Sequence, residues 1–350
     1  MGVYCEINLC KPVDGVYTPG STVSGKIKYC LDKETIFSKI IVSLKGHGWL
    51  VLDDDFQKSN DQLCTYRNSE NYVDVENIIY ENVKGKPLPA GSYETEFNYQ
   101  LPQNIPGSLK YVNKSPKYTV WCNIKYYVRI KFDKPELLSF NKHYKKKITV
   151  VSGATPRLPT EPTVYGEQTS LFQLGSLLSN KKSIVNIKAT MANSVVKPGD
   201  TVKVDYEVEN NTNLTLKAVE IKLVQVDSFT VKGKKDARIV EDVKETDIKY
   251  GAMQSGETKT FSDEITIVAG LASLDHSKII SRDYAVAITA VIPMPHRNLV
   301  LEIHVQVIER LESSLEASGS APPSYWEAMG EEKKELLGRD DSSDEEKEKS

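Results

Sequence analysis

Two stretches of the chain share one pattern: YTPGSTVSGKIKY at Tyr17–Tyr29 and VKPGDTVKVDYEV at Val196–Val208. In each stretch, a Pro-Gly turn is followed by residues that alternate between apolar and polar. Alternation with a period of two is typical of a half-buried β-strand, and Pro-Gly is a turn signal. The second stretch lies 179 positions after the first, which indicates two copies of one β unit in the chain.

The next predicted strand keeps the same offset. Its apolar positions recur as the pairs Ile40 and Val219, Val42 and Ile221, and Leu44 and Leu223. Further along, LPAGSYETEFNYQLP at Leu88–Pro102 is echoed by MQSGETKTFSDEITI at Met253–Ile267. Strands this short must bury one face against a second sheet. We therefore predict an all-β protein with two tandem immunoglobulin-like antiparallel β-sandwiches, at residues 1–151 and 184–308.

The remaining two segments lack this alternation. Residues 152–183 contain Pro156, Pro159 and Pro162, which favour an extended, semi-rigid connector. Residues 309–350 contain 13 acidic and 6 basic residues and few core-forming side chains, so we predict an acidic, disordered tail.

Composition and charge exclude several classes of protein. The chain has 350 residues and a net charge of −3. The tail carries −7, so residues 1–308 carry +4. A nucleic-acid binder with one dominant basic face is not expected at this charge. No apolar run reaches 18 residues, and the first residues lack the features of a signal peptide. The cysteines are odd in number and none is in a C-x-x-C motif, which is typical of a reduced, cytoplasmic protein.

No motif for catalysis, a cofactor or a metal is present. The five histidines have no metal-ligand spacing with one another or with cysteine, and no P-loop, G-x-G-x-x-G or G-x-S-x-G occurs. We therefore expect a protein that is not an enzyme and has no cofactor. Two alternatives remain open: a sandwich enzyme whose remote residues converge in space, and an extracellular adhesion sandwich, which would need a signal peptide and paired cysteines.

Five blocks of the sequence, in order, resemble the α-arrestins, the arrestin domain-containing proteins. These blocks are YTPGSTVSGKI at Tyr17–Ile27, LPAGSYETEFNYQLPQNIPGSL at Leu88–Leu109, IKYYVRIKFDKP at Ile124–Pro135, VVKPGDTVKVDYEVENNT at Val195–Thr212 and PMPHRNLVLEIHVQVI at Pro293–Ile308. The resemblance implies a non-enzymatic adaptor whose two sandwiches bind cytosolic regions of membrane receptors or transporters. It also implies a tail that recruits HECT-type ubiquitin ligases through their WW domains, so that cargo is ubiquitinated, endocytosed and sorted at the plasma membrane and endosomes.

The tail contains a Pro-Pro-x-Tyr motif at Pro322, Pro323 and Tyr325, within GSAPPSYWEAMG. WW domains bind such segments because the polyproline II backbone is already extended and loses little entropy on docking. Many α-arrestins carry two such motifs, whereas this chain has one. Whether one motif suffices without avidity therefore stays open.

Three weaker signals remain. Glu332 with Leu336 and Leu337 fits an acidic dileucine signal of the kind that clathrin adaptors bind. Ser342 and Ser343 are candidate phosphorylation sites, because they precede acidic residues, as acid-directed kinases prefer. In the first predicted sandwich, Lys142, Lys145, Lys146 and Lys147 form a basic run that could contact anionic lipid or a phosphorylated cargo tail, although edge strands also carry lysine to block aggregation. A functional dileucine signal would favour the alternative function, an arrestin-type trafficking scaffold that links cargo to coat proteins without a ubiquitin ligase.

Overall fold

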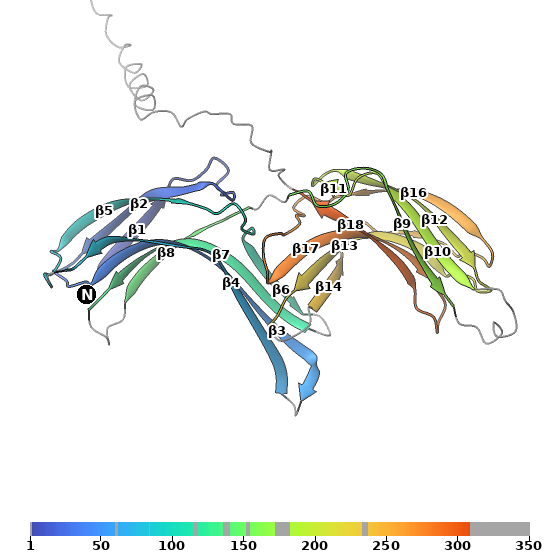
Figure 1. Ribbon diagram of the computed structural model, residues 1–350, viewed down its shortest axis with the longest axis horizontal. Coiled ribbons are helices and arrows are strands. Elements are labelled where there is room, and N and C mark those ends of the chain that lie inside the picture. Colours follow the sequence, from blue (N-terminus) through green and yellow to red (C-terminus); the bar gives the residue numbers. More distant parts are fainter. Residues whose placement is uncertain are drawn as a thin grey trace, which may run out of the picture. The chain divides into compact units, whose positions relative to one another are not determined.

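The computed structural model describes residues 2–59, 62–83, 85–114, 118–135, 141–151, 155–171, 183–232 and 237–308, with side chains left undescribed at 55–63. All regular secondary structure in these ranges is β-strand. The strands form two sandwiches, one built from β1 to β8 and the other from β9 to β18 (Figure 1). The predicted fold class, two tandem antiparallel β-sandwiches, is therefore confirmed. The predicted disorder of 309–350 lies outside the described residues.

In the first sandwich, a three-stranded sheet in the order β1-β2-β5 packs against a sheet in the order β4-β3-β7-β6, with β8 also paired to β7. Its strands are β1 (Val3–Leu9), β2 (Thr22–Leu31), β3 (Lys39–Ser59), β4 (Gln62–Glu81), β5 (Gly91–Gln100), β6 (Leu109–Lys114), β7 (Tyr118–Asp133) and β8 (Lys142–Ile148). Side chains alternate between the two faces of each strand. Ile27 of β2 and Val42 of β3 consequently meet in one buried apolar cluster between the sheets.

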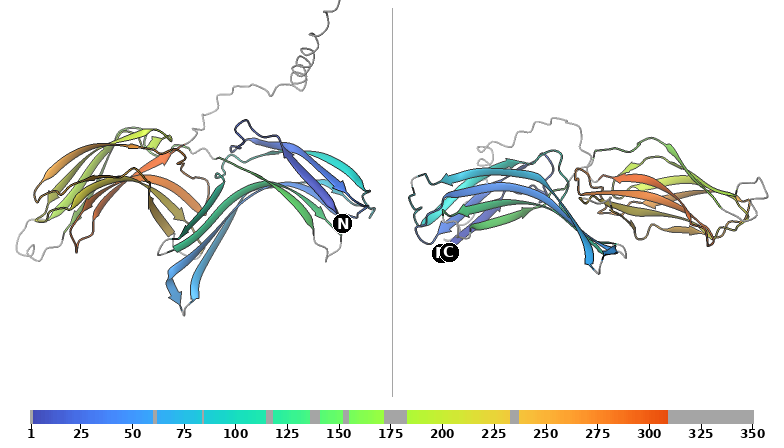
Figure 2. Two further views of the ribbon diagram at one scale, coloured as in Figure 1. Left: turned by 180° about the vertical axis from the view of Figure 1, so that it is seen from behind. Right: turned by 60° about the horizontal axis from the view of Figure 1, so that its bottom comes forward.

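In the second sandwich, a sheet in the order β16-β12-β10-β9 packs against a sheet in the order β11-β18-β17-β13-β14, with β15 also paired to β13. Its strands are β9 (Thr163–Ser170), β10 (Ile184–Met191), β11 (Val195–Val196), β12 (Thr201–Asn211), β13 (Ala218–Phe229), β14 (Ala237–Asp242), β15 (Ile248–Tyr250), β16 (Thr258–Thr266), β17 (Ile280–Val291) and β18 (Leu299–Val307). Figure 2 shows the two layers of each sandwich from behind. A second buried cluster fills the space between these sheets.

The internal repeat is a repeat of topology. The order β1-β2-β5 in the first copy corresponds to β10-β12-β16 in the second, and β4-β3-β7 corresponds to β14-β13-β17. The turn glycines Gly20 and Gly199 both have positive φ, 76° and 91°, which glycine adopts without the steric cost that a Cβ would add. The offset of 179 residues therefore places the same turn before the corresponding strand in both copies.

The predicted connector at 152–183 differs from the structure in one respect, because it contains strand β9. This strand pairs along its whole length with β10, from Thr163 opposite Met191 to Ser170 opposite Ile184. β9 is an edge strand, and its outward residues are in solvent, as shown by Val164 with 72% of its surface exposed. An edge strand draws its stability from ladder hydrogen bonds on one side, so it does not need the apolar alternation that marks a central strand.

The two sandwiches are in contact within the compact unit Met1–Leu311. The ring of Tyr111 in β6 lies 5.3 Å from that of Phe229 in β13, centroid to centroid. A bulge in β4 leaves Tyr72 without a partner in β3, and its hydroxyl lies 2.9 Å from Oγ of Ser277 in the second sandwich. Aromatic packing and hydrogen bonding thus both join the sandwiches.

We expect Gly25→Ala to destabilise the first sandwich by about 1–3 kcal/mol or more, since overpacking at a rigid site is costly. Gly25 lies in β2 opposite Leu9 of β1, and an added Cβ would approach the backbone oxygen of Asn8 to 2.1 Å. Gly166→Ala in β9 is the matched control, because the nearest heavy atom to its added Cβ is 3.7 Å away. Thermal unfolding of both variants tests this, and a similar midpoint for the two would contradict it.

Candidate binding face of the first sandwich

The residues singled out in the sequence fall into two groups. Those in the tail, Pro322, Pro323, Tyr325, Glu332, Leu336, Leu337, Ser342 and Ser343, lie outside the described residues. The four lysines all lie in β8, which pairs with β7, and all four are exposed.

The strand register separates the four lysines, so they do not form the single patch that their spacing suggested. Lys145 and Lys147 lie opposite Arg129 and Tyr127 of β7 and share their face of the sheet. Lys146 lies opposite the buried Val128 and so belongs to the other face. Lys142 lies opposite the buried Phe132 and therefore belongs to the same face as Lys146. Its Nζ donates a hydrogen bond of 3.1 Å to the backbone oxygen of Val3.

Lys145 and Lys147 share their face with a histidine of β3 and a lysine of β7. β3 and β7 pair without a break from Lys39 opposite Asp133 to Asp54 opposite Tyr118. This register places His47 of β3 directly opposite Lys125 of β7, on the face that points away from β1-β2-β5.

Tyr127 lies among these basic side chains. Nζ of Lys145 is 4.8 Å from the centroid of the Tyr127 ring, within the range of a cation–π contact. The His47 ring meets the same tyrosine edge-on at 5.9 Å between centroids. We name His47, Lys125, Tyr127, Lys145 and Lys147 the Tyr127 cluster.

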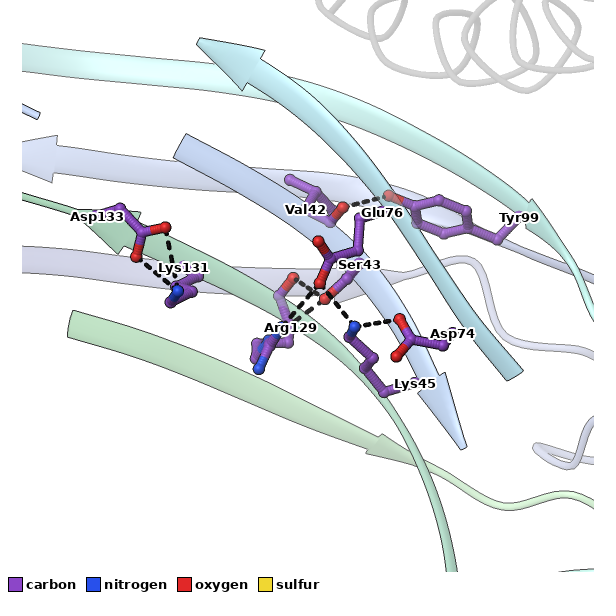
Figure 3. A network of polar contacts seen from close by, with 9 residues as sticks. All are labelled: Val42, Ser43, Lys45, Asp74, Glu76, Tyr99, Arg129, Lys131 and Asp133. Carbon is purple, nitrogen blue, oxygen red and sulfur yellow. Dashed lines mark hydrogen bonds and ion pairs between the residues drawn. The ribbon is translucent and has the colours of Figure 1, made fainter. Parts of the chain in front are cut away.

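Other cations on this face are neutralised by carboxylates. Lys45 forms ion pairs with Asp74 and Glu76 of β4, and Arg129 pairs with Glu76 at 3.2 Å (Figure 3). Lys131 pairs with Asp133 at 2.8 Å. Within the described ranges, no ion pair involves the lysines of the Tyr127 cluster, so their charge is available to a ligand.

Burial of the His47 ring lowers the pKa of its imidazole below the ordinary value, and the positive charges of Lys125 and Lys145 lower this pKa further. The imidazole is therefore neutral at neutral pH in the free protein. His47 and Lys125 could not be identified from the sequence, because they lie in separate strands and only the β3–β7 register brings them together.

The comparisons with known proteins agree with this architecture. Residues 5–155 match the family model described as arrestin (or S-antigen), N-terminal domain, and residues 181–310 match that of the C-terminal domain. The chain belongs to the arrestin family. It is similar to arrestin domain-containing protein 5 of Homo sapiens, with 22% identity over 246 residues that cover 68% of each chain. It is also similar to the Bos taurus protein of that name, with 23% identity over 255 residues, covering 68% of this chain and 70% of the relative.

Both relatives are arrestin domain-containing proteins, in agreement with the α-arrestin resemblance of the sequence motifs. Arrestin-family proteins act in general as adaptors in trafficking rather than as enzymes. In the described parts of this arrestin, no group of three or more His, Cys, Asp or Glu side chains is arranged to hold a metal ion. Nor do those parts include a helix that is long and apolar enough to cross a membrane.

The same face of this arrestin also carries two tryptophans. Trp49 of β3 and Trp121 of β7 are half-buried and lie further along the face from the Tyr127 cluster. Large aromatic side chains with a polar edge are common in protein interfaces. The face therefore combines partly exposed aromatic rings with lysines that form no ion pair among the residues that the structure describes.

Proposed function

We propose that this arrestin is a non-enzymatic cytoplasmic adaptor that places membrane-protein cargo beside a ubiquitin ligase. The sandwiches would hold the cargo, and the tail motif at Pro322, Pro323 and Tyr325 would bind a WW domain of a HECT-type ligase. The observation that carries this proposal is the presence, in one chain, of both arrestin domains and a Pro-Pro-x-Tyr motif. The adaptor would work at the plasma membrane and endosomes, with ubiquitination, endocytosis and sorting of the cargo as its result.

The physical basis of the tail contact is a preformed extended backbone. Pro322 and Pro323 fix their φ angles near the polyproline II value, so little conformational entropy is lost when they dock on an aromatic groove. Tyr325 adds a ring and a hydroxyl as a second anchor. A single peptide of this kind binds with a Kd on the order of micromolar, about −8 kcal/mol, and a tethered second contact would strengthen it.

For the cargo contact, we propose the face of β3, β7 and β8 that carries the Tyr127 cluster. Lys145 and Lys147 of the basic run lie on this face, and within the described ranges they have no carboxylate partner. Unpaired cations beside half-buried aromatic rings suit an anionic segment of a cargo protein, through charge-assisted hydrogen bonds and aromatic packing. Ser342 and Ser343 remain proposed phosphorylation sites that would add negative charge to the tail.

A trafficking scaffold that links cargo to clathrin adaptors without a ligase is the second candidate. The observation in its favour is the acidic dileucine pattern of Glu332, Leu336 and Leu337 in the tail. This candidate shares the sandwiches and the cargo contact with the first. The two differ only in which tail motif binds a partner.

Affinity capture from cell lysate with the wild type and Tyr325→Ala side by side tests the proposed function. We expect WW-domain ubiquitin ligases, identified by mass spectrometry, to be recovered with the wild type and lost with Tyr325→Ala, while membrane cargo is retained. Ser324→Ala is the control, since it leaves both anchors of the motif in place. Equal recovery of ligases with wild type and Tyr325→Ala, together with loss of clathrin adaptors on Leu336→Ala, would favour the scaffold.

A further inference from the structure

Strand β9 leaves one edge of the second sandwich open. It is the last strand of the sheet β16-β12-β10-β9 (Figure 1), and its 8 residues pair with β10 without a bulge. Among the described residues, β9 pairs with no strand except β10. A row of backbone N–H and C=O groups therefore points away from the sheet, and such a row is a template for a further strand.

Most other edge strands carry a feature that opposes the addition of a strand. β8 carries four lysines, and β4 is interrupted by register shifts. β1 is obstructed at Val3, whose backbone oxygen accepts a hydrogen bond from Lys142. β5 and β14 present acidic side chains at several positions. β9 contains no lysine and no proline, and Glu167 is its one charged residue, so its edge lacks this protection.

Gly166, near the middle of β9, is not explained by the packing of its own chain. It is not one of the glycines with positive φ. The nearest heavy atom that an added Cβ would meet, the backbone oxygen of Ile187, is 3.7 Å away. A glycine inside a strand weakens it and often marks a place where another backbone approaches closely. Within the described ranges no backbone makes that approach at the free edge, which points to a strand from another molecule.

We propose that β9 pairs with β9 of a second copy of this chain, antiparallel and centred on Gly166. The two four-stranded sheets would then form one continuous sheet. In a two-fold antiparallel pair, residues equally far from the centre on either side face each other. The facing pairs, one residue from each copy, are Val164 with Gln168, Tyr165 with Glu167, and Thr163 with Thr169.

The charge of β9 selects this register and suits a second copy. The other centre that gives a ladder of the same length is Glu167, and there the carboxylate would face its own copy. Like charges directly opposite each other destabilise a strand pair. With Gly166 at the centre, every facing pair contains at most one charge, and two glycines without side chains meet at the axis. The strand is therefore complementary to itself, as a two-fold interface requires.

The dimer would supply a second Pro-Pro-x-Tyr motif, which one chain lacks. A single ladder of this length falls below the roughly 1,000 Å² of a stable interface, so we expect a Kd on the order of micromolar or weaker. Two linked motifs would raise the affinity for a ligase with two WW domains by about 10²- to 10⁴-fold where both can bind at once. This consequence rests on the proposed function, whereas the dimer itself does not.

Sedimentation velocity of the full chain tests the dimer. Between about 1 and 200 μM, a range that brackets such a Kd, the sedimentation coefficient of the wild type should rise from the monomer value towards that of a dimer. Val164→Lys with Gln168→Lys, the lysine variant, sets like charges against each other and should stay monomeric throughout. Val164→Glu with Gln168→Glu, the glutamate variant, should also stay monomeric.

Two further samples separate this pairing from a general effect of charge. An equal mixture of the lysine and glutamate variants should restore the dimer, because each lysine then faces a glutamate. Val164→Lys with Gln168→Glu should dimerise alone, because the centre at Gly166 sets its lysine against the glutamate of the other copy. Each variant should keep the wild-type unfolding midpoint, since both positions are exposed and face uncharged residues of β10.

Three results would contradict the inference. A wild type that stays monomeric at the highest concentration overturns it and leaves the edge of β9 to a strand of another protein. A dimer that persists in both like-charge variants places the contact on another surface. A mixture that dimerises while Val164→Lys with Gln168→Glu does not refutes the register centred on Gly166.

Titration with a ligase fragment of two WW domains distinguishes the dimer from the proposed function. Above the Kd of the dimer, the fragment should bind the wild type about tenfold or more tightly than the lysine variant, while a single WW domain binds both equally. A dimer without this difference refutes the gain in affinity. If neither fragment binds either protein, ligase recruitment fails, and the sedimentation result alone decides the dimer.

Discussion

Asp227→Asn is expected to destabilise the second sandwich by about 3–5 kcal/mol, because it leaves a buried guanidinium without its counter-charge. Asp227 and Arg282 are partners in the β13–β17 register. The guanidinium donates two hydrogen bonds to the carboxylate, from Nε at 2.7 Å and from Nη2 at 3.2 Å. The two side chains are 1% and 18% exposed, and the ring of Tyr111 lies 5.6 Å from the guanidinium carbon.

Asp242→Asn is the matched control for this prediction. Asp242 of β14 forms a pair of similar length with Lys222, at 2.7 Å, but its side chain is 65% exposed. Exposed pairs contribute at most about 1 kcal/mol, since water and salt screen them. Chemical denaturation followed by tryptophan fluorescence and circular dichroism measures both variants, and equal shifts for the two would refute the prediction.

A double variant tests the cause. In Asp227→Leu with Arg282→Met, both charges are replaced by apolar groups, which removes the desolvation cost along with the attraction. We expect it to recover most of the stability lost in Asp227→Asn. A double variant as unstable as the single one would show that shape at this site, rather than the unpaired charge, limits the stability.

Several strands and the two-copy repeat could be predicted from the sequence because their signals are local. Alternation along Thr22–Leu31 and Thr201–Asn211, each after a Pro-Gly turn, identifies β2 and β12 without any knowledge of their neighbours. The repeat then extends this assignment to strands with weaker patterns. Strand β9 could not be predicted in this way, because an edge strand can be polar on both faces and the three prolines before it favoured a connector.

The candidate site could be predicted only in part, because its members are brought together by register rather than by spacing. Lys145 and Lys147 were identified from their run in the sequence, whereas His47 and Lys125 are 78 residues apart and meet only through the β3–β7 ladder. A shift of one residue in that ladder would place them on opposite faces of the sheet. The same holds for Asp227 and Arg282, whose pairing no local pattern indicates.

A peptide spanning Ser318–Met329 should lose roughly 5- to 150-fold in WW-domain affinity when Tyr325 is replaced by alanine. The reason is the loss of one aromatic anchor, about 1–3 kcal/mol for an interface hot spot. Since one Pro-Pro-x-Tyr contact is on the order of micromolar, a loss of this size would abolish recruitment in cells unless a second contact adds avidity. Phosphorylation of Tyr325 should act in the same direction, because a dianion would then have to enter an aromatic groove.

Isothermal titration of HECT-ligase WW domains with the wild-type, Tyr325→Ala and Ser324→Ala peptides measures this effect. Ser324 occupies the variable position of the motif and is neither of its anchors, so Ser324→Ala should bind within about twofold of the wild type, in line with near-neutral positions around a hot spot. Equal affinity of the wild-type and Tyr325→Ala peptides would mean that the motif does not bind WW domains. Ligase recruitment would then lose its physical basis, and the trafficking scaffold that uses Glu332, Leu336 and Leu337 would become the better account of the tail.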